Sequence, residues 1–125
     1  MTIVDTSALI DSLTGPRRSH RRLRQLIEDG ERLVLPTLVL YEWWRGPRTT
    51  DELEIQEVLC PQDQALTFGA EEAEVAARLY RAVNRPRGRE LDLVIAAHAI
   101  SRDAALWTLN VEDFKDIPGL MLIQG

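Results

Sequence analysis

The stretch MTIVDTSALIDSL, residues 1–13, decides the fold. It begins with a short apolar run that ends at an acid, Asp5, and Leu9 and Leu13 then share one face at helical spacing. A short apolar strand followed at once by an amphipathic helix is typical of a parallel β/α unit. The stretch therefore predicts a buried first strand, a helix, and an acid at the junction between them.

The same alternation continues along the chain. Four further short apolar runs, each bounded by turn residues, predict strands at 33–35, 66–68, 106–108 and 120–123. Apolar residues spaced by three and four predict helices between them. Strands that alternate with helices form right-handed crossovers and a parallel sheet covered on both faces. We therefore expect an α/β fold, a three-layer α/β/α sandwich with a parallel five-stranded sheet, in a single domain over residues 1–125.

The composition narrows the functional classes. No apolar run approaches the roughly 18 residues of a membrane span, and no basic region precedes the first apolar run, so we expect a cytoplasmic protein without a membrane segment. A single cysteine, Cys60, excludes an intramolecular disulfide and a cysteine-based zinc site. The net charge of −5 is unfavourable for binding nucleic acid. However, 14 of the 15 basic residues are arginines, which suit phosphate contacts, and they gather in three clusters at 17–24, 45–48 and 78–89. A solvated surface explains each cluster equally well on its own.

Four acids stand out by their position. Asp5 follows the first strand, Glu42 lies in the apolar segment TLVLYEWWRG, Asp92 opens the helix LDLVIAAHAI, and Asp113 follows the strand predicted at 106–108. Each has an ordinary explanation as well. Asp5 can be a helix N-cap, Glu42 can pair with a nearby arginine, the helix dipole favours Asp92, and an Asx hydrogen bond can close the turn before Asp113.

Taken together, these acids predict a cation site, because the carboxyl ends of parallel strands meet at one edge of the sheet. Two carboxylates about 4 Å apart repel by about 4 kcal/mol at an effective dielectric constant of about 20. Protonation or a divalent cation must offset that repulsion, and oxygen ligands favour Mg²⁺ or Mn²⁺ over zinc. Thr108 and Asn110 offer further neutral oxygens, while the hydroxyls of Thr6 and Ser7 are expected to cap the following helix. Such a site suits phosphodiester hydrolysis by a metal-activated water.

Four blocks, VDTSALID, YEWWRG, LDLVIAAHAI and TLNVEDF, resemble in order and spacing the signature blocks of PIN-domain ribonucleases of the VapC toxin family, part of type II toxin-antitoxin systems. The resemblance spans nearly the whole chain. It implies a set of catalytic, metal-binding acids formed by Asp5, Glu42, Asp92 and Asp113, supported by Thr6 or Ser7 and by Asn110. Many members of the family have an aspartate at the position of Asn110, so the fourth ligand is either Asp113 or shared between Asn110 and Asp113. We expect one metal ion here and treat Asp113 as the provisional ligand.

The resemblance also implies a sheet in the order 3-2-1-4-5, a homodimer, and a cognate antitoxin that binds DNA and blocks the cleft. We therefore expect a Mg²⁺- or Mn²⁺-dependent endoribonuclease that cuts single-stranded or looped RNA. Trp43 and Trp44 can stack a base, although core or dimer packing explains them better. The alternative is a catalytically silent PIN-like module that acts through a protein partner. A phosphate-processing enzyme for small substrates is weaker, because the chain has no glycine-rich phosphate loop.

Overall fold

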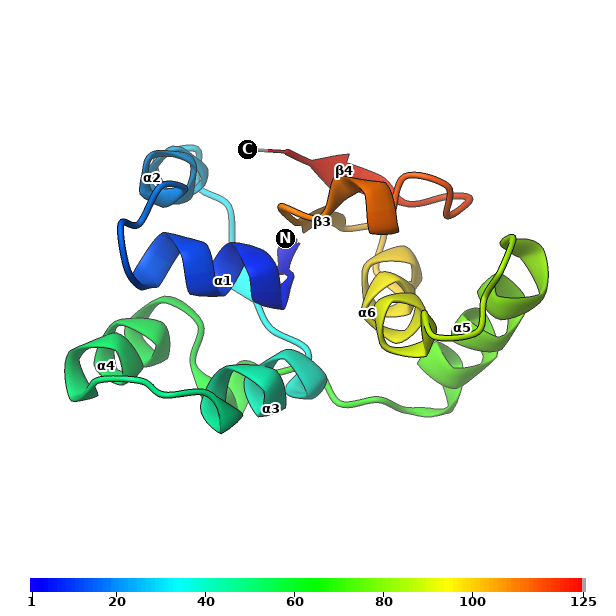
Figure 1. Ribbon diagram of the computed structural model, residues 1–125, viewed down its shortest axis with the longest axis horizontal. Coiled ribbons are helices and arrows are strands. Elements are labelled where there is room, and N and C mark those ends of the chain that lie inside the picture. The colour runs from blue at the N-terminus through cyan, green and yellow to red at the C-terminus, as the bar shows by residue number, and fades with distance from the viewer. Residues whose placement is uncertain (125) are drawn as a thin grey trace.

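The computed structural model describes residues 1–124. At its centre lies one sheet of four parallel strands in the order β2-β1-β3-β4 (Figure 1). The strands are β1 (Thr2–Val4), β2 (Leu33–Val34), β3 (Ala105–Trp107) and β4 (Met121–Ile123). All three pairings are parallel, so the four carboxyl ends lie at the same edge of the sheet. Asp5, directly after β1, therefore lies at the edge where α/β proteins form their sites.

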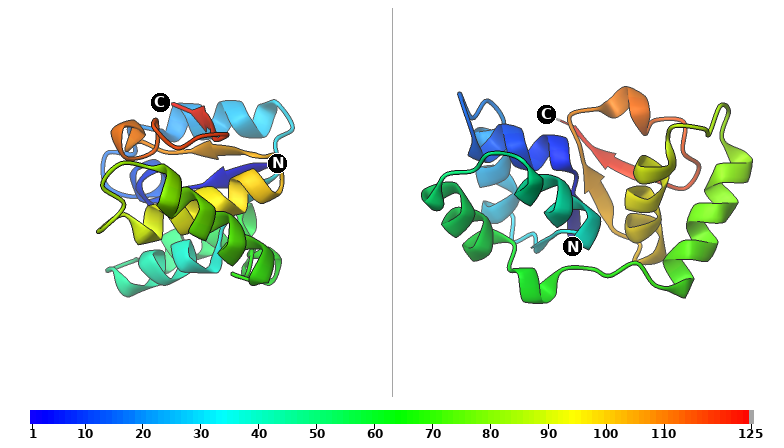
Figure 2. Two further views of the ribbon diagram at one scale, coloured as in Figure 1. Left: turned by 90° about the vertical axis from the view of Figure 1, so that its right-hand side faces the viewer. Right: turned by 60° about the horizontal axis from the view of Figure 1, so that its bottom comes forward.

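The predicted helices are confirmed, and they lie on both sides of the sheet (Figure 2). They are α1 (Thr6–Leu13), α2 (His20–Glu28), α3 (Thr37–Arg45), α4 (Thr50–Leu59), α5 (Ala70–Ala82) and α6 (Glu90–Ser101), with two short 3-10 helices, η1 (Gln62–Gln64) and η2 (Val111–Asp113). The α/β sandwich with a parallel sheet is thus confirmed. No helix within residues 1–124 is long and apolar enough to cross a membrane.

The prediction of a fifth strand at 66–68 is wrong, because this segment forms only one isolated parallel bridge, between Leu66 and Pro36. The Leu66 amide donates to the Leu35 carbonyl over 2.9 Å, and the Thr37 amide donates to the Leu66 carbonyl, also over 2.9 Å. The pairing stops there because α3 begins at Thr37 and leaves no further strand beside the segment. The predicted order 3-2-1-4-5 is therefore confirmed for predicted strands 2, 1, 4 and 5, which are β2, β1, β3 and β4. Predicted strand 3 does not form, and the bridge between Leu66 and Pro36 marks where it would lie.

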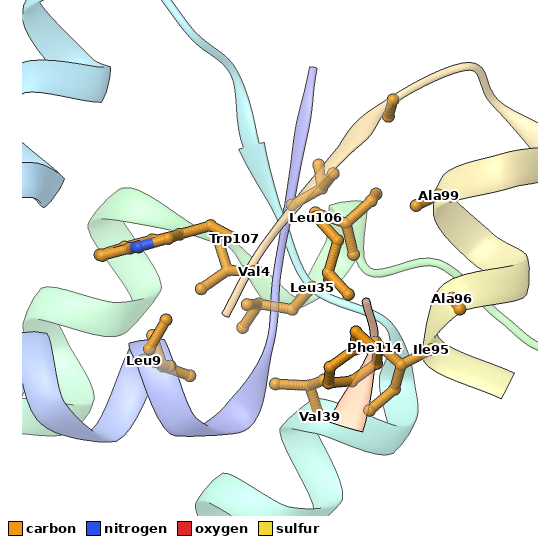
Figure 3. Packing of buried hydrophobic residues seen from close by; sticks show 14 of the residues in the cluster. Val4, Leu9, Leu35, Val39, Ile95, Ala96, Ala99, Leu106, Trp107 and Phe114 are labelled. Carbon is orange, nitrogen blue, oxygen red and sulfur yellow. The ribbon is translucent and has the colours of Figure 1, made fainter. Parts of the chain in front are cut away.

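The core lies between the sheet and its helices, as Figure 3 shows for Val4, Leu106 and Trp107 from the strands and Leu9 and Ile95 from the helices. The three strand residues are all at most 1% exposed. Because successive strand residues point to opposite faces, Leu106 and Trp107 serve the two layers of core that a sheet buried on both sides requires. The core thereby fixes the positions of the strand ends that carry the site.

Cys60 is buried, as its apolar surroundings require, and burial raises the pKa of its thiol to about 12. A thiol that stays protonated at neutral pH is a poor nucleophile and a poor metal ligand. Cys60 therefore acts as a small hydrophobic residue of the core.

Candidate active site

The Asp5 carboxylate is held in place by two hydroxyl groups. Only 5% of the residue is exposed, and its Oδ2 accepts hydrogen bonds of 2.8 Å from both Ser7 Oγ and Thr108 Oγ1. Asp5 occupies the N-cap position of α1, but its side chain makes no capping hydrogen bond. The N-cap interpretation therefore does not account for this carboxylate.

The expectation that Thr6 and Ser7 cap α1 through their hydroxyls is wrong, because both hydroxyls donate to acids instead. Ser7 donates to Asp5, and Thr6 Oγ1 donates to Glu42 Oε1 over 2.6 Å. Helix α1 begins at Thr6, so Asp5 occupies the N-cap position and both hydroxyls lie within the first turn, from which they reach the carboxylates. The first turn of α1 thus orients two of the four predicted acids.

The hydroxyls of Ser7 and Thr108, which donate to Asp5, also hold the loop after β3 in place. The Leu109 amide donates to Ser7 Oγ over 3.1 Å, and the Asn110 amide donates to Thr108 Oγ1 over 3.0 Å. Asn110 therefore contributes through its backbone, and its side chain caps neither the turn nor η2. These bonds set the position of the loop that leads to Asp113.

Glu42 lies on α3 with its side chain 17% exposed. Besides the Thr6 hydroxyl, it has Arg45 as a partner, with Nη2 at 3.6 Å from its Oε2. The predicted pairing with an arginine is thus confirmed, but the contact with Thr6 ties Glu42 to the first turn after Asp5. Arg48, the other candidate partner, instead donates to the Trp43 carbonyl and stacks over the Trp43 ring.

Asp92 lies in the first turn of α6, as predicted, and has the most perturbed carboxyl group among the four acids. Its pKa is raised to about 6, first by burial and then by the negative charges of Asp5, Asp113 and Glu42, while Arg89 opposes the rise. A buried acid surrounded by like charges favours its protonated form. The other three predicted acids, which come from separate blocks of sequence, therefore all act on Asp92.

Asp113 is the most exposed corner of the site. It ends η2, where its amide donates to the Asn110 carbonyl over 2.9 Å. Its influence on the Asp92 carboxyl shows that its charge acts on the same site, but no hydrogen bond to its side chain fixes it within residues 1–124. Asp113 thus remains the provisional ligand.

Arg89 is a site residue that the sequence did not single out. Its guanidinium donates to both carboxylate oxygens of Asp116, over 2.6 and 2.9 Å, and to the Asp113 carbonyl over 3.0 Å. The ion pair lowers the pKa of Asp116 and joins the start of α6 to the segment after η2. The sequence indicated only that Arg89 belongs to a basic cluster, because an ion pair across 27 positions has no local pattern.

The donor set suits a hard divalent cation, since it consists of carboxylate and hydroxyl oxygens. Within residues 1–124, no three His, Cys, Asp or Glu side chains are close enough to enclose a metal ion directly. Mg²⁺ is commonly bound by only one or two carboxylates and keeps several waters. The raised pKa of Asp92 reflects its burial first and then the negative charges around it, which such an ion would neutralise. The residues therefore fit an ion held by few direct ligands, not a closed cage.

Comparisons with known proteins agree with this architecture. Residues 2–120 match the family model of the PIN domain. The chain is 32% identical to Ribonuclease VapC19 of Mycobacterium tuberculosis over 127 aligned positions, which cover 96% of this chain and 97% of the relative. The chain belongs to the PIN domain family. Within that family, its similarity to VapC19 extends over almost the full length of both chains, as the four sequence blocks predicted.

Solved structures share the fold at lower sequence identity. The structure of VapBC2 from Rickettsia felis, bound to a DNA fragment from its promoter, contains a chain that matches with a TM-score of 0.75 at 20% identity, covering 99% of this chain and 98% of that one. VapBC-1 from nontypeable Haemophilus influenzae matches with a TM-score of 0.68 at 24% identity, over 98% and 96% of the two chains. These likenesses confirm the VapC-type PIN fold.

Proposed function

We propose that this chain is a Mg²⁺- or Mn²⁺-dependent endoribonuclease, the toxin of a type II toxin-antitoxin pair that acts in the cytoplasm. The observation that carries the proposal is that Asp5, Glu42 and Asp92 lie together at the carboxyl edge of a PIN-family sheet, where the charges of Asp5 and Glu42 both raise the pKa of Asp92. A relative whose name states a ribonuclease activity, alike over 96% of this chain, supports RNA as the substrate.

The proposed chemistry divides between the ion and the protein. A divalent cation bound here supplies a Lewis acid for the phosphodiester and lowers the pKa of the attacking water. Asp5, fixed by Ser7 and Thr108, provides a ligand oxygen in a constant position. Glu42 is oriented by Thr6 and provides the second. Preorganised ligands of this kind lose little conformational freedom when the ion and substrate bind.

Asp92 has a distinct part in this proposal. With a pKa of about 6, its carboxyl group holds a proton in a large fraction of molecules in weakly acidic solution. A cation held beside Asp92 would favour the ionised carboxylate, so that proton would be lost to solvent when the ion binds. Ion binding at this site therefore becomes weaker as the pH falls below about 6.

The partners follow from the relatives. Several similar structures are VapBC assemblies, which supports a cognate antitoxin as the binding partner of this chain. We further propose a homodimer. An apolar cleft between α5 and α6, lined by Ala76, Tyr80 and Leu93, offers a surface that a second copy can cover.

Cleavage of end-labelled single-stranded RNA tests the proposal, with protein that a chelator has freed of metal and with Mg²⁺ or Mn²⁺ either added or left out. We expect endonucleolytic fragments only when metal is present. A protein that binds its antitoxin but leaves RNA intact at every metal concentration would instead be the catalytically silent PIN-like module.

A further inference from the structure

The chain carries an unusually dense group of positive charge at the start of α2, although its net charge is −5. Five arginines lie between positions 17 and 24, and no acid occurs among them. We call the exposed surface formed by Arg18, Arg21, Arg22 and Arg24 the arginine face. Such local concentration of one sign creates a positive potential even on an acidic protein.

Helix α2 directs the side chains of Arg21 and Arg24 outward, Arg22 is half-buried, and Arg18 lies just before the helix. Leu23 and Leu26 are buried against the core, so the opposite side of the helix faces solvent. Two grooves run along that side and share Arg21 and Gln25. One, of about 470 Å³, is completed by His20, Arg24 and Glu28, and the other, of about 500 Å³, is completed by Arg18, Arg22 and Gln124.

The arginines at 45–48 already have partners, because Arg45 pairs with Glu42 and Arg48 stacks over an indole ring at 4.3 Å. In the cluster at 78–89, Arg89 pairs with Asp116, while the other arginines form no ion pair within residues 1–124. In the arginine face, Arg22 donates to Gln124 and Gln25, but neither Arg21 nor Arg24 forms an ion pair among the same residues. The guanidinium groups of Arg21 and Arg24 therefore keep their donors for a ligand.

The arginine face adjoins the edge of the sheet that carries the candidate active site. Arg22 Nε donates to the Gln124 carbonyl over 2.9 Å, and Gln124 directly follows β4 (Figure 1). Strand β4 is two strands from β1, and neighbouring strands lie about 4.8 Å apart. The end of β4 is thus about 10 Å along the edge from the end of β1, where Asp5 lies.

We propose that the arginine face binds the phosphates of the single-stranded RNA whose neighbouring segment lies in the active site. The proposal rests on the proposed function and extends it to a specific part of the surface. A chain of phosphates suits adjacent guanidinium groups, each of which can bind an oxyanion through two parallel hydrogen bonds. It also explains how an acidic protein with an acidic catalytic edge can hold a polyanion.

The salt dependence of binding tests this proposal. Binding of a fluorescein-labelled oligouridylate is measured by anisotropy across a series of NaCl concentrations, in EDTA and in the Asp5→Asn background to prevent cleavage. Each phosphate contact to single-stranded RNA contributes about 0.7 to the slope of log affinity against log salt. We therefore expect Arg21→Gln/Arg24→Gln to reduce the magnitude of the slope by about 1.4 and to weaken binding about tenfold or more at low salt.

The matched control is Arg32→Gln/Arg78→Gln, which removes the same charge from two exposed arginines away from α2. We expect this control to retain the slope of the parent, and circular dichroism to show that both doubly substituted proteins are folded. An equal slope for the parent and Arg21→Gln/Arg24→Gln, or an equal loss in the control, would overturn the proposal. So would weakened binding to polyglutamate with unchanged RNA binding, which would assign the face to an acidic protein partner.

The two proposals fail in different ways. If wild-type protein leaves RNA intact but the slope falls as expected, the arginine face binds RNA and the endoribonuclease proposal is wrong. If RNA is cleaved but Arg21→Gln/Arg24→Gln leaves the slope unchanged, the proposal that the arginine face binds RNA is wrong and the catalytic proposal stands.

Discussion

Thr108 donates a 2.8 Å hydrogen bond to the carboxylate of Asp5, although 103 positions separate the two residues in sequence. The bond joins the end of β3 to the end of β1, which are neighbours in the sheet. A buried carboxylate is costly unless donors satisfy it, and Ser7 provides the second donor. The sheet register therefore positions the acid that is central to the site.

Replacing Thr108 by valine tests this relationship. Valine has nearly the same shape but no hydroxyl, so Asp5 loses one donor and the Asn110 amide loses its acceptor. We expect the free energy of unfolding at neutral pH to fall by about 1–3 kcal/mol, measured by urea denaturation. Thr108→Ser keeps the hydroxyl and is the control, and equal stabilities of the valine and serine variants would contradict the prediction.

The raised pKa of Asp92 predicts how stability depends on pH. In the folded protein this pKa is about 6, compared with an ordinary value of 3.8, so the folded state holds the proton more tightly than the unfolded state. The stabilising contribution is present below pH about 4 and is lost as the pH rises through about 6. Without metal, ionised Asp92 thus destabilises the fold at pH 7.5.

Asp92→Asn removes this titration. We expect the metal-free variant to be more stable than wild type by about 1–2 kcal/mol at pH 7.5, a figure reduced for partial solvent exposure, with the difference disappearing near pH 4. Thermal denaturation of both proteins at several pH values measures this difference in stability. Added Mg²⁺ should raise the melting temperature of wild type more than that of the variant. A stability difference that is constant from pH 4 to 7.5 would contradict the assignment.

The two adjacent tryptophans of α3 have different roles. Trp43 is fully buried and cannot stack a base, whereas Trp44 is 48% exposed. We expect Trp43→Ala to cost about 3–5 kcal/mol of unfolding free energy and Trp44→Ala less than about 1 kcal/mol, measured by urea denaturation. Similar losses for the two variants would contradict this distinction.

The spacing of apolar residues predicted the helices and four of the five proposed strands correctly. The alternation of strands and helices was enough to predict a parallel sheet with Asp5 and Thr108 at its carboxyl edge, and the helical pattern placed Asp92 in a first turn. These predictions succeeded because hydrophobic spacing is a property of short segments. The resemblance to VapC proteins added the order of the strands, in which the strands that carry Asp5 and Thr108 are neighbours.

Other features could not be predicted because they depend on tertiary contacts. The segment 66–68 has the apolar pattern of a strand, yet α3 begins at Thr37 and removes its partner. The hydroxyl of Thr6 was expected at a helix cap, but Glu42 comes within 2.6 Å only after the chain folds. The spacing of residues along the chain does not show which distant partner a hydroxyl group meets after folding.

RNA cleavage by Asp5→Asn tests the central claim most directly, because the substitution removes one charge and keeps the shape of the side chain. Asp103→Asn makes the same change at an exposed residue just before the amino end of β3, whereas the predicted site lies at the carboxyl edge of the sheet, and serves as the control. With Mg²⁺ or Mn²⁺ present and folding verified by circular dichroism, we predict that wild type and Asp103→Asn cleave single-stranded RNA at similar rates. Asp5→Asn should show no cleavage above background, and a folded Asp5→Asn protein that cleaves as fast as wild type would contradict the proposed active site.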